Sequence, residues 1–344
     1  MDYITPVAIA QLVILLFVFV MLLSSAAGMV YMERKVAARI QQRMGPTLVG
    51  PYGLLQPLAD IIKLAMKEDV RPAAADPILF AIAPIISAAT AFTAFAVVPF
   101  GAETTFFGLL DRPVPLQVAD VNVAILWVFA VTSMGVYGIV LAGWSSNSKY
   151  SLLGALRSSA QMISYELSYG MALAAVLVLA NSMSIRDIVN AQEGSWLGFI
   201  PRWFVFLQPI GFFIFMTAGV AETNRAPFDF PEAEQERVAG YHTEYSSMSF
   251  AMFFLADYIN MVTVSAIATS LYLGGWNGPL LPEWLGWIWF LAKVGFLLFF
   301  YVWMRWTLPR YRYDQLMAFG WKFLLPLSVV NLLATAAGVL YFGI

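Results

Sequence analysis

Long uncharged stretches dominate the pattern of hydrophobic and polar positions along the chain. Eight of them are long enough to cross a hydrocarbon core of ~30 Å, which takes about 20 helical residues. Two are each interrupted by a single charge, Asp257 or Lys293. An even number of crossings places both termini on one side. The pattern predicts an all-α, polytopic membrane protein with about eight transmembrane helices, at residues 3–32, 77–102, 121–148, 167–185, 203–221, 245–282, 284–304 and 323–344.

A shorter segment, residues 50–69, has a different pattern. Its apolar residues recur at about the 3.6-residue period of a helix, while Asp60, Lys63 and Lys67 fall off the apolar face. This predicts an amphipathic helix that is too short to span the membrane and lies in its interface. Two interpretations remain open: a strap over the helix bundle, or the lining of an entrance for an amphiphilic ligand.

Composition supports the membrane assignment. Hydrophobic residues make up 60% of the chain, against ~45–50% in ordinary soluble domains. The first apolar stretch is much longer than the ~7–15 residues of a cleaved signal and has no basic segment before it. We therefore expect a retained first helix. With no internal repeat visible, we also expect a single transmembrane domain over residues 1–344.

The distribution of positive charge predicts an orientation. Fifteen of the 19 Lys and Arg residues fall in alternate loops, and positive residues are retained on the cytoplasmic side. These loops, expected inside, are residues 32–76, 144–160, 222–248 and 305–322. The termini are then periplasmic, for a chain in a bacterial inner membrane, or on the equivalent side of a mitochondrial inner membrane.

Residue counts exclude several kinds of chemistry. The chain has no cysteine and one histidine, His242. Disulfides, a cysteine-ligated zinc, an iron-sulfur cluster and a bis-histidine haem are therefore excluded within this chain. If the function involves electrons, a partner must carry them.

Residues 221–245, "AETNRAPFDFPEAEQERVAGYHTEY", concentrate acid in one loop. Against six carboxylates stand two arginines, Arg225 and Arg237, so the segment has a formal net charge of −4 in a chain of −2. Helix capping explains only two or three of the acids. A solvated charged face, a cation or proton site, and a docking surface for a basic partner all remain open. The six acids are Glu222, Asp229, Glu232, Glu234, Glu236 and Glu244.

Three ions fall inside the expected spans: Glu166, Asp257 and Lys293. A charge at the bilayer centre costs at least ~2.5–3.5 kcal/mol, so such groups usually face the bundle interior and mark a pathway. Asp257 and Lys293 are expected at similar depths, either as a structural ion pair or as part of a charged file that continues from Glu222. Carboxylates at successive depths, without metal-ligating histidines, favour protons over a metal.

Basic residues gather next to the expected interfacial helix. Taken singly, Arg34, Lys35, Arg305, Arg310 and Arg312 are typical membrane-interface anchors. Together with Tyr311, Tyr313 and the amphipathic helix, they are compatible with the rim of a site for a polar-headed, lipid-like substrate.

Five ordered motifs carry a family resemblance over essentially the whole chain. They are "YMERKVAARIQQRMGP" (31–46), "GPYGLLQPLADIIKL" (50–64), "QMISYELSYG" (161–170), the acidic segment 221–245 and "RYRYDQLM" (310–317). The chain resembles the H-subunit family of bacterial NADH:quinone oxidoreductase, respiratory complex I, equivalent to mitochondrial subunit one. Homologous membrane subunits of energy-converting hydrogenases are an alternative, as is a self-contained proton-coupled transporter; a purely structural anchor is a further rival.

The resemblance implies a membrane subunit that forms much of a quinone chamber and couples quinone reduction to proton translocation. Quinone is the implied substrate, and NADH, FMN and iron-sulfur clusters belong to partner subunits. The implied partners are the other complex I subunits, quinone and the lipid bilayer, with no nucleic acid, no metal and no catalytic residue in this chain. For the quinone chamber it implies Glu33, Arg34, Asp60, Lys63, Phe228, Arg310 and Arg312. For the proton path it implies Glu166, Glu222, Arg225, Asp229, Glu232, Glu234, Glu236, Glu244, Asp257 and Lys293. Asp257 stands where that family often has glutamate, and "PEAEQE" stands in place of "PEGESE".

Overall fold

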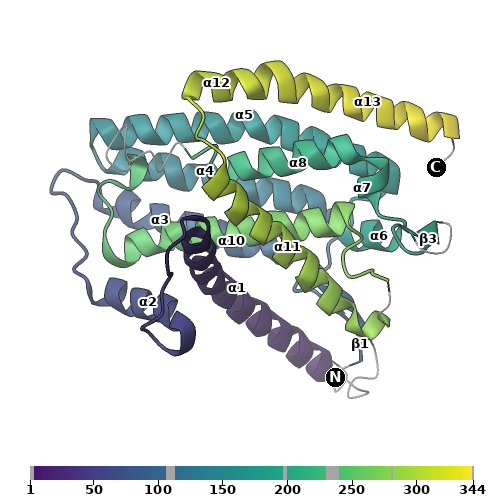
Figure 1. The fold of residues 1–344 in the computed structure, drawn as a ribbon, viewed down its shortest axis with the longest axis horizontal. Coiled ribbons are helices and arrows are strands. Elements are labelled where there is room, and N and C mark those ends of the chain that lie inside the picture. The colour runs from purple at the N-terminus through teal and green to yellow at the C-terminus, as the bar shows by residue number, and fades with distance from the viewer. Residues whose placement is uncertain (1–3, 106–112, 197–199, 230–239, 280–281, 343–344) are drawn as a thin grey trace.

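The computed structural model describes residues 4–105, 113–196, 200–229, 240–279 and 282–342. Within these ranges the chain is overwhelmingly helical, which confirms the all-α prediction (Figure 1). The strands form two short antiparallel pairs, β1 (Gly101–Thr104) with β2 (Val114–Leu116) and β3 (Ser195–Trp196) with β4 (Ile200–Pro201). The helices are α1 (Ile4–Ile40), α2 (Gln56–Met66), α3 (Pro77–Phe95), α4 (Ala124–Ser145), α5 (Lys149–Ala180), α6 (Ile185–Asn190), α7 (Phe204–Leu207), α8 (Pro209–Glu222), α10 (Ser247–Tyr272), α11 (Gly286–Thr307), α12 (Tyr313–Phe319) and α13 (Leu325–Phe342).

Seven helices in the described ranges are long and apolar enough to cross a membrane. The chain is therefore a multi-pass membrane protein, and seven of the eight expected spans have a full-length helix. The fifth is divided: Gln208 leaves the helical conformation (φ −130°, ψ 54°) directly before Pro209, so α7 ends there and α8 runs for only 14 residues. A residue before proline is sterically pushed away from the helical region. α1 starts and α13 ends toward the same end of the bundle (Figure 1).

Helix α5 corrects the expected fourth span. The sequence predicts residues 167–185, but α5 runs from Lys149 to Ala180 and includes both Arg157 and Glu166. Each charge has a partner on a neighbouring element: the Arg157 guanidinium lies 4.8 Å from the centre of the Tyr313 ring, and Ser133 donates a hydrogen bond to Glu166. A charge that is satisfied by tertiary contacts does not end a helix.

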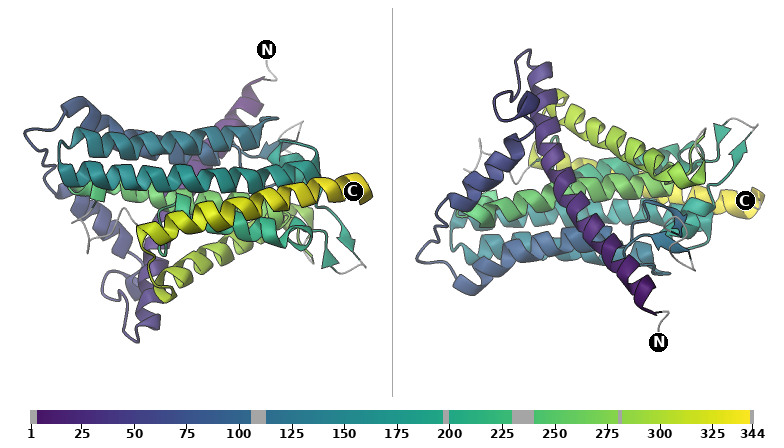
Figure 2. Two further views of the ribbon diagram at one scale, coloured as in Figure 1. Left: turned by 90° about the horizontal axis from the view of Figure 1, so that it is seen from above. Right: turned by 90° about the horizontal axis from the view of Figure 1, so that it is seen from below.

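The packing is centred on α10. It contacts α1, α2, α3, α6, α8 and α11, and most of its residues are buried. Helices α3, α4, α5 and α10 run roughly along one direction, whereas α1 crosses them obliquely (Figure 2). At ~1.5 Å per residue the 37-residue α1 is about 55 Å long, longer than a ~30 Å core is thick, and its last turns carry the charged residues Glu33, Arg34, Lys35 and Arg39.

Close contact between α4 and α5 depends on a small residue. A Cβ atom at Gly143 would lie 2.3 Å from the Cβ of Ala155. Small residues allow membrane helices to approach closely and gain packing energy where lipid offers no hydrophobic driving force between helices. This contact brings the polar residues of α4 next to α5.

Serines at the start of α10 hold α2 in place. The Ser247 hydroxyl lies 2.9 Å from the carbonyl oxygen of Leu64 and 2.8 Å from that of Lys67, at the end of α2. The Val70 amide donates to the Ser246 hydroxyl at 2.9 Å. Helix α2 is thus strapped to α10, while its apolar residues Leu58 and Ile61 stay about half exposed. Both features fit an amphipathic helix in the membrane interface.

We predict that the end of the bundle that carries α2 faces the cytoplasm. The chain has no native cysteine, so single cysteines report sidedness cleanly. Leu48, 95% exposed, precedes α2, and Glu193 is exposed in the loop after α6. In intact cells, a membrane-impermeant thiol reagent should label Glu193→Cys and spare Leu48→Cys. The reverse pattern would invert the orientation.

Candidate functional site

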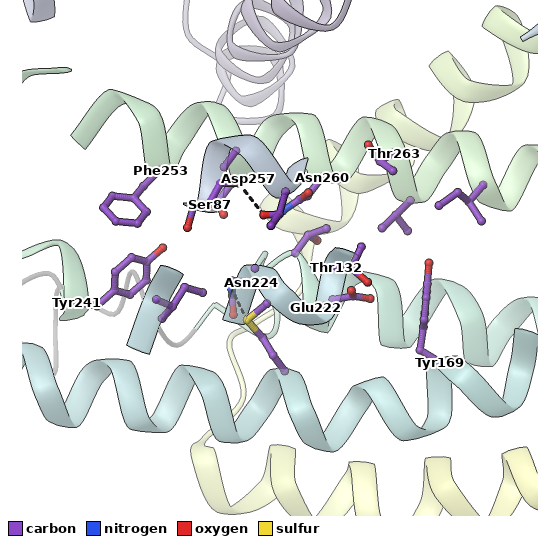
Figure 3. Close-up of a pocket in the computed structure, with 18 residues that line it drawn as sticks. Ser87, Thr132, Tyr169, Glu222, Asn224, Tyr241, Phe253, Asp257, Asn260 and Thr263 are labelled. Atoms are coloured by element: carbon purple, nitrogen blue, oxygen red, sulfur yellow. Dashed lines mark hydrogen bonds between the residues drawn. The ribbon is translucent and has the colours of Figure 1, made fainter. Parts of the chain in front are cut away.

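A small cavity with both apolar and polar walls lies between α3, α4, α5, α8 and α10 (Figure 3). Its volume is about 30 Å³, which is room for about two water molecules, since each needs at least ~10–15 Å³ of such space. A polar cavity of this size retains water when its walls offer hydrogen-bonding partners. Polar lining comes from Ser87, Thr132, Glu222, Asn224, Asp257 and Asn260.

Glu222 ends α8 and projects into this cavity. The Thr132 hydroxyl hydrogen-bonds to its carboxyl group, and the two side chains lie side by side in Figure 3. The second oxygen, Oε2, is buried and has no hydrogen-bond partner among the described residues. Because an unsatisfied buried oxygen is costly, this atom is a natural partner for a water in the cavity.

Glu166 joins Glu222 through the next residue of α4. Ser133, which follows Thr132, donates a hydrogen bond to Glu166. The two carboxyl groups, one on α5 and one on α8, are close enough to interact electrostatically. Two consecutive hydroxyls of α4 therefore bring together two acids that lie 56 positions apart in the sequence.

Asp257 reaches the same cavity from α10. It lies ten residues after Ser247, the first residue of α10, about 15 Å along the helix. Figure 3 shows Asp257 and Asn260 on the α10 side and Glu222 on the facing side. Two of the expected proton-path acids, Glu222 and Asp257, thus line one cavity inside the bundle, and Glu166 lies close to Glu222.

Lys293 departs from the expected arrangement. Its ammonium donates to the carbonyl oxygens of Leu273 (2.6 Å), Gly275 (2.9 Å) and Asn277 (2.6 Å). Leu273 follows Asp257 by 16 residues, about 24 Å along α10. The expected file that joins Lys293 to Asp257 is therefore wrong. Carbonyls at a helix end lack intrahelical partners and attract cations, so the long lysine side chain turns to the end of α10.

A second cluster joins α1, α10 and α11. The buried Glu33 accepts a hydrogen bond from the Tyr258 hydroxyl at 2.8 Å and forms an ion pair with Arg305 at 2.6 Å. The guanidinium of Arg225, also buried, lies 4.3 Å from the centre of the Tyr258 ring. We call Glu33, Tyr258, Arg225 and Arg305 the Glu33 cluster. The sequence assigned Glu33 to the quinone chamber and Arg225 to the proton path, and it gave Arg305 only as one of the basic residues near the interfacial helix. Tyr258 was not predicted as a site residue.

The other residues expected around a quinone chamber separate into two places. Arg34 and Asp60 form a 2.7 Å ion pair between α1 and α2, and Lys63 is exposed on α2. Beyond α11, Arg310 forms a 3.0 Å ion pair with the buried Asp229. Two more residues expected for the quinone chamber are Arg312 and Phe228. Arg312 is exposed and forms a 3.2 Å ion pair with the exposed Asp314. Phe228 is buried and packs on Tyr165, Tyr311 and Phe319.

The acidic loop is described only at its ends. Gln161 of α5 donates 2.8 Å hydrogen bonds to the carbonyl oxygens of Ala221 and Phe228, which fixes the start of the loop. At the far end, a Cβ atom on Gly154 would lie 2.9 Å from the Cα of Gly240, so α5 packs tightly there too. Glu244 is partly buried beyond this point. Glu232, Glu234 and Glu236 lie outside the described residues.

Several polar residues at or beside the cavity carry little signal in the sequence. Thr132 and Ser133 are a polar pair within an apolar stretch, Asn260 is a polar residue three positions after Asp257, and Asn224 is an uncharged residue of the acidic segment. Hydroxyls in membrane helices commonly bond back to their own helix, so their presence does not mark a site. Among the described residues, no group of three His, Cys, Asp or Glu side chains is arranged to hold a metal ion.

Comparison with known proteins gives a family match over nearly the whole chain. The model of the NADH dehydrogenase family matches residues 12–336. The first of the numbered H subunits of NADH-quinone oxidoreductase from Geobacter metallireducens is 53% identical over 334 residues, covering 96% of this chain and 98% of that protein. The second numbered H subunit from Koribacter versatilis is 52% identical, with 96% of each chain covered. The H subunit from Thermomicrobium roseum is 53% identical over 90% of each chain.

Gln161→Leu should loosen the start of the acidic loop. The substitution leaves the carbonyls of Ala221 and Phe228 buried without this donor, at a cost of ~1–3 kcal/mol for each unsatisfied group. We expect a lower thermal unfolding temperature and faster protease cleavage within residues 222–245. Ile163→Val, at an exposed position of the same helix, is the matched control. Equal unfolding temperatures and cleavage rates in the two variants would contradict this role.

Proposed function

The chain belongs to the NADH dehydrogenase family, and on that premise we propose that it is the membrane subunit of an NADH:quinone oxidoreductase that borders the quinone passage and starts a proton path. The observation that carries the proposal is that Glu222 and Asp257 line a water-sized cavity inside the bundle, with Glu166 close enough to Glu222 to interact with it electrostatically. Intramembrane acids of this kind are expensive and mark ion or proton pathways.

The quinone passage is proposed to run beside α2 and the Glu33 cluster. Arg34, Asp60 and Lys63 supply polar groups on α1 and α2, and the half-exposed apolar residues of α2 supply a surface for an isoprenoid tail. Ligand sites of this type combine apolar walls with few polar groups. Phe228 is packed in the core, so its contribution would be to the wall behind Arg310 and Asp229.

Two pairs of consecutive residues connect the proposed passage to the cavity. On α10, Asp257 lines the cavity and Tyr258 bonds to Glu33. After α8, Asn224 lines the cavity and Arg225 stacks on Tyr258. A change of charge at Glu33 therefore acts on Tyr258 and Arg225, whose sequence neighbours Asp257 and Asn224 line the cavity. This is a short structural route for coupling quinone chemistry to protonation in the cavity.

The cavity itself can pass protons. Carboxyl groups take up and release protons, and the adjoining hydroxyls and water can hand them on between acids. Glu232, Glu234, Glu236 and Glu244 of the acidic loop are proposed to extend this path toward the quinone side. Lys293, which the structure separates from Asp257, is left out of the path.

The electron carriers are assigned to partners. The chain has no cysteine, so it cannot ligate an iron-sulfur cluster with thiolates. We propose that NADH, FMN and the clusters are bound by soluble-arm subunits, that antiporter-like membrane subunits continue the proton path, and that the isolated chain has no redox activity. The proposed location is the bacterial inner membrane with periplasmic termini.

Purification from the native membrane should yield a complex with cluster-bearing subunits; recovery of an active single chain would support a transporter instead.

Asp257→Asn should impair coupling. The variant keeps the shape of the side chain but cannot release a proton, and a positioned proton-transfer group typically contributes ~10²–10⁴-fold. We expect quinone-linked turnover and proton pumping in the assembled complex to fall about tenfold or more. Asp257→Glu should be tolerated, because the cavity has room for one methylene and the acid is kept. Full pumping by an assembled Asp257→Asn complex would remove this residue from the path.

Lys63→Ala should weaken the handling of quinone. Losing one hydrogen bond to a polar headgroup, worth ~0.5–1.5 kcal/mol, would raise the apparent KM for quinone roughly two- to tenfold. Electron transfer from NADH to a water-soluble acceptor should stay normal. Lys67→Ala, just beyond the end of the same helix, is the control. An unchanged KM would exclude Lys63 from the passage.

A further inference from the structure

Lys293 occupies a built cation site at the end of α10 that lies near α6 and α7. Its side chain is buried, and all three ammonium hydrogens are directed to carbonyl oxygens, those of Leu273, Gly275 and Asn277. The ammonium also lies 4.4 Å from the centre of the Trp203 ring. Three carbonyls and an aromatic face hold the positive charge firmly in position.

The backbone at this site is shaped to surround the ammonium. Gly274 and Gly275 adopt left-handed conformations (φ 71° and 53°), which fold the chain back after Leu273. A Cβ atom at Gly275 would lie 2.7 Å from a methyl carbon of Val189, so no other residue fits there without displacement. The turn aims carbonyls of residues 273, 275 and 277 at one point.

Gln192 completes the closure of this end. Its amide nitrogen lies 2.9 Å from the Ser270 carbonyl and 3.2 Å from that of Leu271, and its oxygen accepts from the amides of Phe204 and Gly274. The backbone groups at the end of α10 are thus satisfied by buried side chains. A water molecule would therefore find few free hydrogen-bonding groups at the end of α10.

A layer of buried residues separates the cavity from Lys293. The last α10 residue that lines the cavity is Ile267, and the hydroxyls between it and Leu273, those of Thr269, Ser270 and Tyr272, all donate to backbone carbonyl oxygens. A proton that leaves the acids along this part of α10 therefore meets apolar side chains and hydroxyls already bonded to the backbone, and then the positive charge of Lys293. Fixed positive groups in narrow passages exclude protons and other cations electrostatically.

We propose that Lys293 is an electrostatic barrier that closes this end of the protein to protons, so that protons in the cavity cannot leak across the membrane along α10. The role differs from that of a proton carrier, because three carbonyl acceptors match the three N–H groups of an ammonium, whereas a neutral amine has only two. The proposal rests on the proton path proposed above, but its test measures leak without turnover. Failure of the barrier and failure of the path are therefore distinguishable.

The test uses the whole purified complex in liposomes with an entrapped pH-sensitive dye. A pH difference is imposed without NADH or quinone, and its passive decay is followed. Lys293→Met removes the charge at similar length, and Lys293→Arg keeps it. We expect Lys293→Met to increase the decay rate about tenfold over wild type, the equivalent of ~1.4 kcal/mol of barrier, and Lys293→Arg to remain close to wild type.

A neutral hydrogen-bonding variant separates charge from structure. Lys293→Gln can donate to two of the carbonyls but carries no charge, so it should leak like Lys293→Met; it also decides the question if Lys293→Met does not assemble. Wild-type tightness in an assembled Lys293→Gln or Lys293→Met complex would overturn the proposal, as would equal leak in Lys293→Arg and Lys293→Met. Co-purification of the membrane and soluble-arm subunits with each variant checks that the complex is intact.

Discussion

Every polar group inside the bundle has to be satisfied by the protein itself, because lipid offers no hydrogen bonds. The rest of the structure depends on this constraint. Gln161 bonds the two carbonyls that bracket the start of the acidic loop, Gln192 bonds the backbone at the end of α10, and Lys293 takes the carbonyls beyond it. Each long polar side chain replaces the water that a helix end would use in a soluble protein. Glu222 Oε2 is one of the buried side-chain atoms that have no protein partner among the described residues, and the cavity beside it has room for water.

Helix α10 links these features because it is both central and polar at intervals. Its first serines hold α2, Tyr258 bonds to Glu33 on α1, Asp257 faces the cavity, and its far end is capped by Lys293 of α11. A displacement of α10 along its axis would change all four contacts together. A rigid helix with contacts at both ends is a physical means of transmitting a change from one side of the membrane to the interior.

Four acids of the described residues, Glu33, Asp229, Glu166 and Glu222, fall into two chemical classes by their partners. Glu33 with Arg305, and Asp229 with Arg310, are paired with cations on other elements. Removing one partner of either ion pair would leave an uncompensated buried charge, which costs several kcal/mol. Glu166 and Glu222 instead are bonded by neutral hydroxyls, Ser133 and Thr132. Neutral partners stabilise a carboxyl group in either protonation state, whereas a cation favours only the charged one. The hydroxyl-bonded acids are the ones suited to proton exchange.

The sequence by itself determined the all-α membrane architecture and the amphipathic helix α2, because hydrophobic length and periodicity are local properties. Its family motifs also pointed to Glu222 and Asp257, which line the cavity, and to Glu166 beside Glu222. Tertiary structure alone decided which charges meet. The sequence predicted that the fourth span starts after Glu166, yet α5 starts at Lys149 and runs through Glu166, whose carboxylate accepts a hydrogen bond from Ser133. The sequence predicted Lys293 at the same depth as Asp257 from backbone positions alone. The long lysine side chain instead donates to the carbonyl oxygens of Leu273 and Asn277, at and beyond the end of α10. Thr132, Ser133 and Tyr258 carry no local signal, since their partners come from other helices. The position of a residue along its helix follows from the local sequence, whereas its contacts depend on how the helices pack.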